Sequence, residues 1–300
     1  IGFEETANIF YDMATPKQIA FFPEARHFEA KNIDCFVNIR ASANKKALSN
    51  VDPKVVGERS KVLRPISEEI VNRKRWILCN YPTHSLAQEA DMSLEEYEDF
   101  LYNATNIDWM KVKQKEMKLK AALDKASEVR IVGKDTDLRL SVKGRKAIPC
   151  FGERNMPDGE VYLSPVENSA EGYIYYEMPA IYQGREVTGI RLRFKAGKVV
   201  EAHADKNEDF LLAMLDTDKG GRYLGELGVG VNYGIQKFTK DILFDEKIGG
   251  TVHLAVGRSY ESAGGKNVSA IHWDMIKDLR KGGAIYLDGK PIQKNGKFLI

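Results

Sequence analysis

Carboxylate side chains stand out in two segments of the second half of the chain. A Pro-Asp-Gly turn leads into strand-like sequence that begins at Glu160, and Glu226 lies among glycines and apolar residues in Leu-Gly-Glu-Leu-Gly. A lone carboxylate in apolar surroundings is costly to bury unless it is paired or binds a metal. Glu226 is therefore a candidate ligand, whereas the position of Glu160 beside a turn also suits an ordinary solvated glutamate.

Histidines occur in two further segments of strand-like sequence. Glu246 precedes His253, and Tyr260 follows it within the same stretch. His272 and Asp274 are separated by one residue, so on a strand their side chains share a face and would present an imidazole beside a carboxylate. That pair suits a divalent metal such as zinc. A single histidine in a strand and a His–Asp contact are also common as purely structural features.

Taken together, the four segments supply the ligand types that a pair of divalent metals needs, namely carboxylates that bridge and histidines or carboxylates that complete each site. A nucleotide site is not indicated, because Gly228, Gly230 and Gly234 do not form the G-x-G-x-x-G pattern. The other three histidines are less persuasive. His27 and His84 belong to the first half of the chain, and His203 is predicted at the surface.

The overall composition argues against nucleic-acid and membrane partners. The formal net charge of the 300 residues is only +2, and no apolar run approaches the ~20 residues of a transmembrane helix. Cys35, Cys79 and Cys150 are widely spaced, so neither a disulfide framework nor a Cys-x-x-Cys metal site is indicated. We expect Cys35 and Cys79 to be small buried side chains. No signal peptide is visible, which predicts a cytoplasmic location.

The expected elements divide the chain near residue 127. Strand-like sequence at 34–39 and 76–80 alternates with helical patterns at 53–72, after 93 and at 109–125, so an α/β domain with a parallel sheet is predicted for residues 1–127. Residues 128–300 read as a β-rich α+β domain that carries the metal-binding residues, with one helical pattern at 206–216. The chain begins at Ile1 rather than at methionine, and we expect an N-terminal portion to be absent.

Several motifs resemble the M29 metallopeptidases, the aminopeptidase T or thermophilic aminopeptidase family. The matching stretches are PDGEVYLSPVENSAEG (157–172), RYLGELGVGVN (222–232), ILFDEKIGGTVHLAVGRSY (242–260), SAIHWDM (269–275) and, in the first half, YPTHSLAQEADMSLEEYEDF (81–100). The resemblance spans essentially the whole chain, and the order and spacing of the motifs make it specific. Family members carry further α/β sequence before the point where this chain starts.

The resemblance implies a two-metal aminopeptidase that forms a homodimer and acts on peptides with a free N-terminus. It assigns metal ligation to Glu160, Glu226, Glu246, His253, His272 and Asp274, with Glu226 able to bridge, and catalytic roles to Glu226 and Tyr260. The segment between Glu246 and His253 is longer than in the relatives, which leaves the exact role of Glu246 open. Zinc, cobalt, manganese and magnesium all accept mixed carboxylate and imidazole ligands.

Two other functions compete with this reading. The same metal site would serve a dipeptidase or amidase, which the products formed from longer peptides would distinguish. A non-catalytic binding protein is the third alternative, with the α/β half holding a small ligand. The retention of every candidate ligand argues against it, because a degenerate enzyme is expected to have lost at least one.

Overall fold

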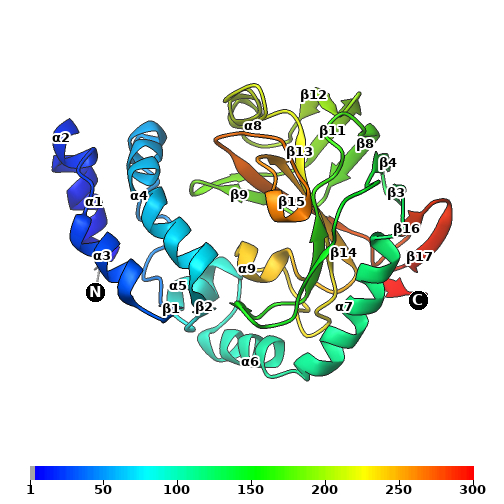
Figure 1. The fold of residues 1–300 in the computed structure, drawn as a ribbon, viewed down its shortest axis with the longest axis horizontal. Helices are drawn as coiled ribbons and strands as arrows, with labels where there is room; N and C mark the ends of the chain where they lie inside the picture. The colour runs from blue at the N-terminus through cyan, green and yellow to red at the C-terminus, as the bar shows by residue number, and fades with distance from the viewer. Residues whose placement is uncertain (1–3) are drawn as a thin grey trace. The chain divides into compact units, whose positions relative to one another are not determined.

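The computed structural model describes residues 4–300, whose contacts fall into two units (Figure 1). The first unit contains the described residues up to Glu98, together with Glu153–Met156 and Gln183–Arg185. The second contains Asp99–Gly152, Pro157–Tyr182 and Glu186–Ile300. Contacts therefore group residues 99–127 with the second unit, and the domain division near residue 127 stays a prediction. Within the described range, no helix is both long and apolar enough to cross a membrane.

Parallel strands form the sheet of the first unit, in the order β1-β2-β6. β1 (Cys35–Arg40) pairs along its whole length with β2 (Arg75–Asn80), and β6 (Asn155–Met156) extends the sheet. α4 (Pro53–Arg73) joins β1 to β2, because parallel neighbours need a crossover connection. The α/β character and the parallel pairing predicted for this half are confirmed.

Shorter helices make up the rest of the first unit. They are α1 (Glu4–Met13), α2 (Pro16–Ile19), α3 (Glu24–Asn32), α5 (His84–Glu89) and the start of α6 (Leu94–Thr105). A capping box starts α6, since the backbone N–H of Glu96 donates to Ser93 Oγ and that of Ser93 donates to Glu96 Oε2.

The expected burial of Cys35 is wrong. Cys35 is exposed and Cys79 is half-buried, and all three cysteines are free. β1 lies at the edge of its sheet, and Val37 and Ile39, which share a face with Cys35, are 63% and 62% exposed. The apolar pattern correctly indicates a strand here. It does not reveal that, among the described residues, one face of this strand is left exposed.

Two antiparallel sheets dominate the second unit. The larger has the order β12-β11-β8-β4-β3-β16-β17-β18, and the smaller β15-β14-β13-β7-β5. Strands of the larger sheet are β3 (Glu128–Gly133), β4 (Thr136–Ser141), β8 (Glu171–Tyr176), β11 (Ile190–Lys195), β12 (Lys198–His203), β16 (Ala284–Leu287), β17 (Lys290–Lys294) and β18 (Lys297–Phe298). Those of the smaller are β5 (Ile148–Cys150), β7 (Glu160–Leu163), β13 (Leu224–Gly230), β14 (Thr251–Gly257) and β15 (His272–Asp278). The remaining elements are a short ribbon, β9 (Ala180–Tyr182) with β10 (Arg185–Val187), the helices α7 (Trp109–Leu123), α8 (Glu208–Leu215) and α9 (Ile242–Asp245), and the 3-10 helix η1 (Glu261–Ala263).

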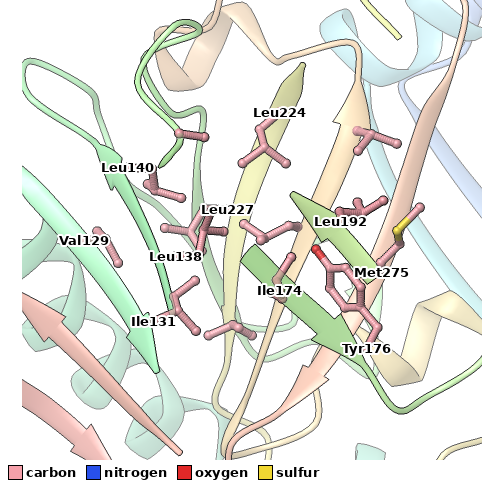
Figure 2. Packing of buried hydrophobic residues seen from close by; sticks show 14 of the residues in the cluster. Val129, Ile131, Leu138, Leu140, Ile174, Tyr176, Leu192, Leu224, Leu227 and Met275 are labelled. Atoms are coloured by element: carbon pink, nitrogen blue, oxygen red, sulfur yellow. The ribbon is translucent and has the colours of Figure 1, made fainter. Parts of the chain in front are cut away.

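The hydrophobic core lies between these two sheets. Figure 2 shows Leu138 of the larger sheet beside Leu227 of the smaller one, and Tyr176 of the larger sheet beside Met275 of the smaller one. All four side chains are almost completely buried. Successive residues of a strand point to opposite faces. The smaller sheet therefore commits one face to the core, and the residues in between, which include Glu226 and Asp274, belong to its other face.

Candidate metal centre

The turn before β7 places Glu160 at the first residue of that strand, as predicted. Gly159 in this turn has a φ of +117°, and a Cβ on it would lie 2.7 Å from the Cβ of Asn232. The Asn232 side chain donates to the carbonyl oxygen of Asp158 at 2.9 Å and so secures the turn. Glu160 is only 6% exposed, so the alternative of a solvated glutamate is wrong.

The six predicted ligands lie together on the face of the smaller sheet that points away from the core. Glu160 comes from β7, Glu226 from β13, His253 from β14, His272 and Asp274 from β15, and Glu246 from the C-terminal end of α9. Their donor atoms form three overlapping groups that fit a metal ion, namely Glu160–Glu226–His253, Glu226–His272–Asp274 and Glu246–His253–Asp274. Within each group all donor atoms lie within 4.8 Å of one another.

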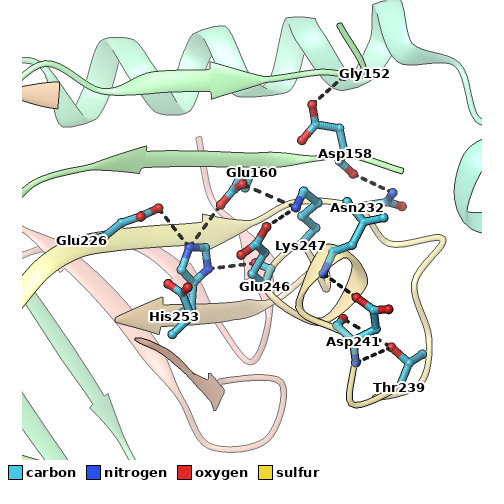
Figure 3. A network of polar contacts seen from close by, with 12 residues as sticks. Gly152, Asp158, Glu160, Glu226, Asn232, Thr239, Asp241, Glu246, Lys247 and His253 are labelled. Atoms are coloured by element: carbon cyan, nitrogen blue, oxygen red, sulfur yellow. Dashed lines mark hydrogen bonds and ion pairs between the residues drawn. The ribbon is translucent and has the colours of Figure 1, made fainter. Parts of the chain in front are cut away.

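Glu226 connects the two histidines. His253 Nε2 lies 3.1 Å from Glu160 Oε2 and 3.4 Å from Glu226 Oε1 (Figure 3). The other oxygen of Glu226, Oε2, lies 3.2 Å from His272 Nε2, which is 3.5 Å from Asp274 Oδ2. One carboxylate thus serves two donor groups, which is the arrangement of a bridging ligand.

Both imidazoles are oriented by backbone carbonyls. His253 Nδ1 is 2.9 Å from the carbonyl oxygen of Glu246, and His272 Nδ1 is 2.7 Å from that of Arg258. An Nδ1–H that donates to a carbonyl leaves Nε2 to face the carboxylates, and this second contact is typical of metal-binding histidines. Asp274 Oδ1 is buried and has no hydrogen-bond partner among the described residues. The residues present therefore fit divalent cations.

Small residues opposite the ligands make room for them. On neighbouring strands, Glu160 is paired with Gly230, His253 with Gly228, His272 with Gly257, and both Asp274 and Glu226 with Ala255. Gly228 is the tightest case, because a Cβ there would lie 2.0 Å from two atoms of the His253 ring. The register of the sheet thus sets a row of ligands beside a row of positions with little or no side chain.

The charges of the cluster are strongly coupled. Burial opposes ionisation of Glu226, but His253 and His272 outweigh it and lower its pKa to about 2. Burial lowers the pKa of His272, yet the Asp274 and Glu226 carboxylates together raise it to about 9. The pKa of His253 is likewise raised, since Glu160 and Glu226 outweigh its burial. Metal ligation requires neutral imidazoles, so metal uptake is expected to release protons.

Lys247 is a charged member of the cluster that sequence reasoning missed. The side chain is completely buried, its ammonium forms an ion pair with Glu246, and Nζ lies 3.7 Å from Glu160 Oε1 (Figure 3). Burial opposes this charge, but Glu246, Glu160 and Asp158 raise the pKa of Lys247. The available signal was the lysine directly after the Asp-Glu pair in a stretch otherwise composed of apolar residues and glycines.

Tyr260 borders the same cluster. Its ring packs against His272 with centroids 5.0 Å apart and against Tyr162 in an edge-to-face contact at 5.5 Å. The buried Ser164 holds the backbone, because Tyr260 N–H donates to Ser164 Oγ at 3.2 Å. Burial and then the charges of Glu226 and Asp274 raise the pKa of the Tyr260 phenol, so its hydroxyl stays protonated at neutral pH.

Comparison with known proteins decides the family. The model of the thermophilic metalloproteases (M29) matches residues 1–298. The chain belongs to the M29 family. The M29 resemblance seen in the motifs is thereby confirmed, and the family description implies a divalent metal.

Named relatives of this M29 chain are aminopeptidases. Aminopeptidase AmpS of Bacillus subtilis is 32% identical over 48% of this chain, and aminopeptidase T of Thermus thermophilus is 30% identical over 49%. Each alignment covers only 40% of the relative's length. Aminopeptidase 2 of Geobacillus stearothermophilus is 27% identical over 88% of this chain and 75% of its own.

Solved structures agree on the fold. AmpT from Thermus thermophilus matches all of this chain and 86% of its own with a TM-score of 0.85 at 24% identity. A 2,5-dihydroxypyridine dioxygenase from Pseudomonas putida matches 95% of this chain and 98% of its own with a TM-score of 0.57 at 14% identity. Because this fold also occurs in a protein titled a dioxygenase, the activity of the M29 chain has to be argued from its site.

Proposed function

We propose that the chain is a metal-dependent aminopeptidase that holds two divalent cations. The observation that supports this most is the pair of donor groups Glu160–Glu226–His253 and Glu226–His272–Asp274, which share one carboxylate. Two-metal hydrolases hold their cations about 3.5–4 Å apart through such a bridge. Membership of the M29 family and relatives named aminopeptidases support the same reaction class.

The cations, when bound, would polarise the scissile carbonyl and lower the pKa of a water from 15.7 to about 7. Glu226 stays ionised at neutral pH because its pKa is depressed, and we assign it the transfer of the water's proton to the leaving amine. Tyr260, whose hydroxyl stays protonated, donates a hydrogen bond to the oxyanion that develops on the carbonyl. Glu246 is paired with Lys247, and we propose that its backbone carbonyl orients His253.

Hydrolysis of unblocked peptides before and after chelation tests the proposal. Release of N-terminal amino acids that is lost on chelation, restored by zinc, cobalt, manganese or magnesium, and absent on N-acetylated peptides is the expected result. Glu226→Gln should abolish turnover without unfolding the chain, whereas Glu201→Gln, an exposed carboxylate on β12, should keep full activity.

Other outcomes separate the alternatives. Hydrolysis restricted to dipeptides or amides would indicate a dipeptidase or amidase on the same site. Inactivity with every metal, in a chain shown to be folded, would remove the peptidase proposal and favour a binding protein. Full activity of Glu226→Gln would remove Glu226 from the mechanism. We also propose that the chain forms a homodimer in the cytoplasm. A monomeric species in sedimentation velocity would contradict the homodimer.

A further inference from the structure

A second cluster of metal-binding residues lies beside the centre described above, on the side of β5. Cys150 of β5 is directly opposite Glu160 of β7 in the antiparallel ladder, and Asp158 precedes β7 in the turn. One donor atom from each of these three residues lies within 4.8 Å of the other two. Asp158 is only 2% exposed, and while its Oδ2 accepts from the Gly152 N–H at 3.0 Å, its Oδ1 is buried without a hydrogen-bond partner in the described chain.

An independent observation on α7 points to the same place. Glu116 is completely buried, and neither of its carboxylate oxygens completes a hydrogen bond with a described residue. It belongs to the buried face of α7 with Leu119 and Leu123, and α7 packs against β5 and β7, the strands that carry Cys150 and Glu160. Burial and then the charges of Asp158 and Glu160 raise the pKa of Glu116 to about 10.

Positive charge is short in this region. Lys247 is the fully buried cation of the cluster, and its ammonium is already paired with Glu246. The Lys247 ammonium also acts on Glu160 and Asp158, but among the described residues no ion pair involves Glu116 or Asp158. Buried carboxyl groups are normally hydrogen-bonded, paired, or bound to a metal. Here the first two solutions are incomplete.

We propose that Cys150, Asp158 and Glu160 bind a third divalent cation, beside the buried Glu116 and separate from the two of the peptidase site, to which Glu160 links it. Two carboxyl groups and one thiol supply three donors, all of kinds that bind zinc. Cobalt accepts the same ligands and serves as a spectroscopic substitute. This site is expected to be structural, because every one of its side chains is buried or half-buried within the sheet and helix layer.

The thiol makes the proposal specific. Coordination deprotonates a thiol outright, and each ligand thiolate that forms releases one proton to solvent. No cysteine lies among the six residues of the peptidase site. A thiolate–metal bond therefore reports on the third site alone, whether or not the peptidase proposal holds.

Cobalt titration of the chain with Cys35→Ser and Cys79→Ser tests the proposal, since Cys150 is then the sole thiol. The expected result is a thiolate-to-cobalt charge-transfer band in the near ultraviolet and three metals per chain by elemental analysis. Adding Cys150→Ser should remove the band and one metal. Glu116→Gln should lower the cobalt affinity, measured from the intensity of the band, by about 10–100-fold, as expected for loss of a supporting contact.

Controls distinguish this site from its neighbour. His272→Ala, which removes a ligand of the peptidase centre, should leave the charge-transfer band in place, and circular dichroism should show that each variant is folded. Absence of the band in a folded chain that binds two cobalt ions would overturn the proposal. A third metal that persists in Cys150→Ser, Glu116→Gln and Asp158→Asn would overturn it as well.

Discussion

Gly228→Ala should disable the metal centre without touching a ligand. Gly228 of β13 lies directly opposite His253 of β14, and the three atoms nearest to a Cβ at position 228 all belong to the His253 ring. Two of them would be 2.0 Å away, whereas ordinary contact begins at 3.4 Å, so the ring has to move by about 1.4 Å. Metal–ligand distances tolerate about 0.2 Å.

The displacement of the His253 ring predicts the size of two effects of Gly228→Ala, namely the loss of metal affinity and the loss of stability. Loss of a contact that merely supports a ligand typically lowers metal affinity by about 10–100-fold, so displacing the ligand itself should cost at least about 100-fold, or roughly 2.8 kcal/mol. Overpacking of a filled interior typically costs about 1–3 kcal/mol in the free energy of unfolding. Competition with a chromophoric chelator measures the affinity, and urea unfolding of the chelated protein measures the stability.

A double-mutant cycle decides whether the His253 ring is the cause. In a His253→Ala background the added methyl group meets no ring, so Gly228→Ala should then cost at least about 1 kcal/mol less than in the wild-type chain. Gly57→Ala is the control, because a Cβ at this helical position meets no atom within 4 Å and should stabilise by up to about 1 kcal/mol. Equal costs in both backgrounds, or unchanged metal affinity, would refute the reasoning.

Three further changes have defined outcomes. Lys247→Met leaves buried carboxylates without their ammonium and should cost the metal-free protein about 3–5 kcal/mol in urea unfolding; a loss below about 1 kcal/mol would contradict this. Ser164→Ala removes the acceptor of the Tyr260 N–H and should lower kcat more than it raises KM, with no further effect in a Tyr260→Phe background. Burial opposes ionisation of Glu167, but the Lys266 N–H and the Arg145 side chain outweigh it and lower its pKa. This stabilisation is present above the unfolded pKa of about 4.3 and is lost as pH falls through the lower folded pKa. Glu167→Gln should therefore lower the thermal stability at pH 7 and match the wild type in acid. A stability difference that does not change with pH would exclude the contacts of Glu167 with Arg145 and Lys266 as its cause.

Local pattern was sufficient to indicate which candidate ligands share a face, because a strand alternates its faces. His272 and Asp274 share a face by spacing alone, and the apolar surroundings of Glu226 indicated a carboxylate with a partner. The register between β13 and β14 could not be predicted from the sequence, because the pairing of His253 with Gly228 depends on how the two strands align. The fold class and the family were predictable from the motifs, whose order and spacing do not depend on that alignment.

Burial was the harder property to predict. Glu116 lies on the buried face of α7 with Leu119 and Leu123, a position where a carboxylate is out of place, and sequence reasoning did not single it out. Cys35 shows the opposite error, since its apolar strand is exposed on one face at the edge of a sheet. Both depend on which neighbours cover a residue, and a single sequence does not state that.

The antiparallel arrangement of the strands that carry the metal centre also determines when this centre forms during folding. Its ligands come from β7, β13, β14 and β15, which run from Glu160 to Asp278 with long connections between them. Contacts between residues so far apart in sequence form late, because the entropy of closing each loop is lost before the contact stabilises the chain. A complete pair of donor groups therefore exists only after all four strands have paired. Added during refolding, a metal ion that changes absorbance on binding would mark the moment at which this sheet closes.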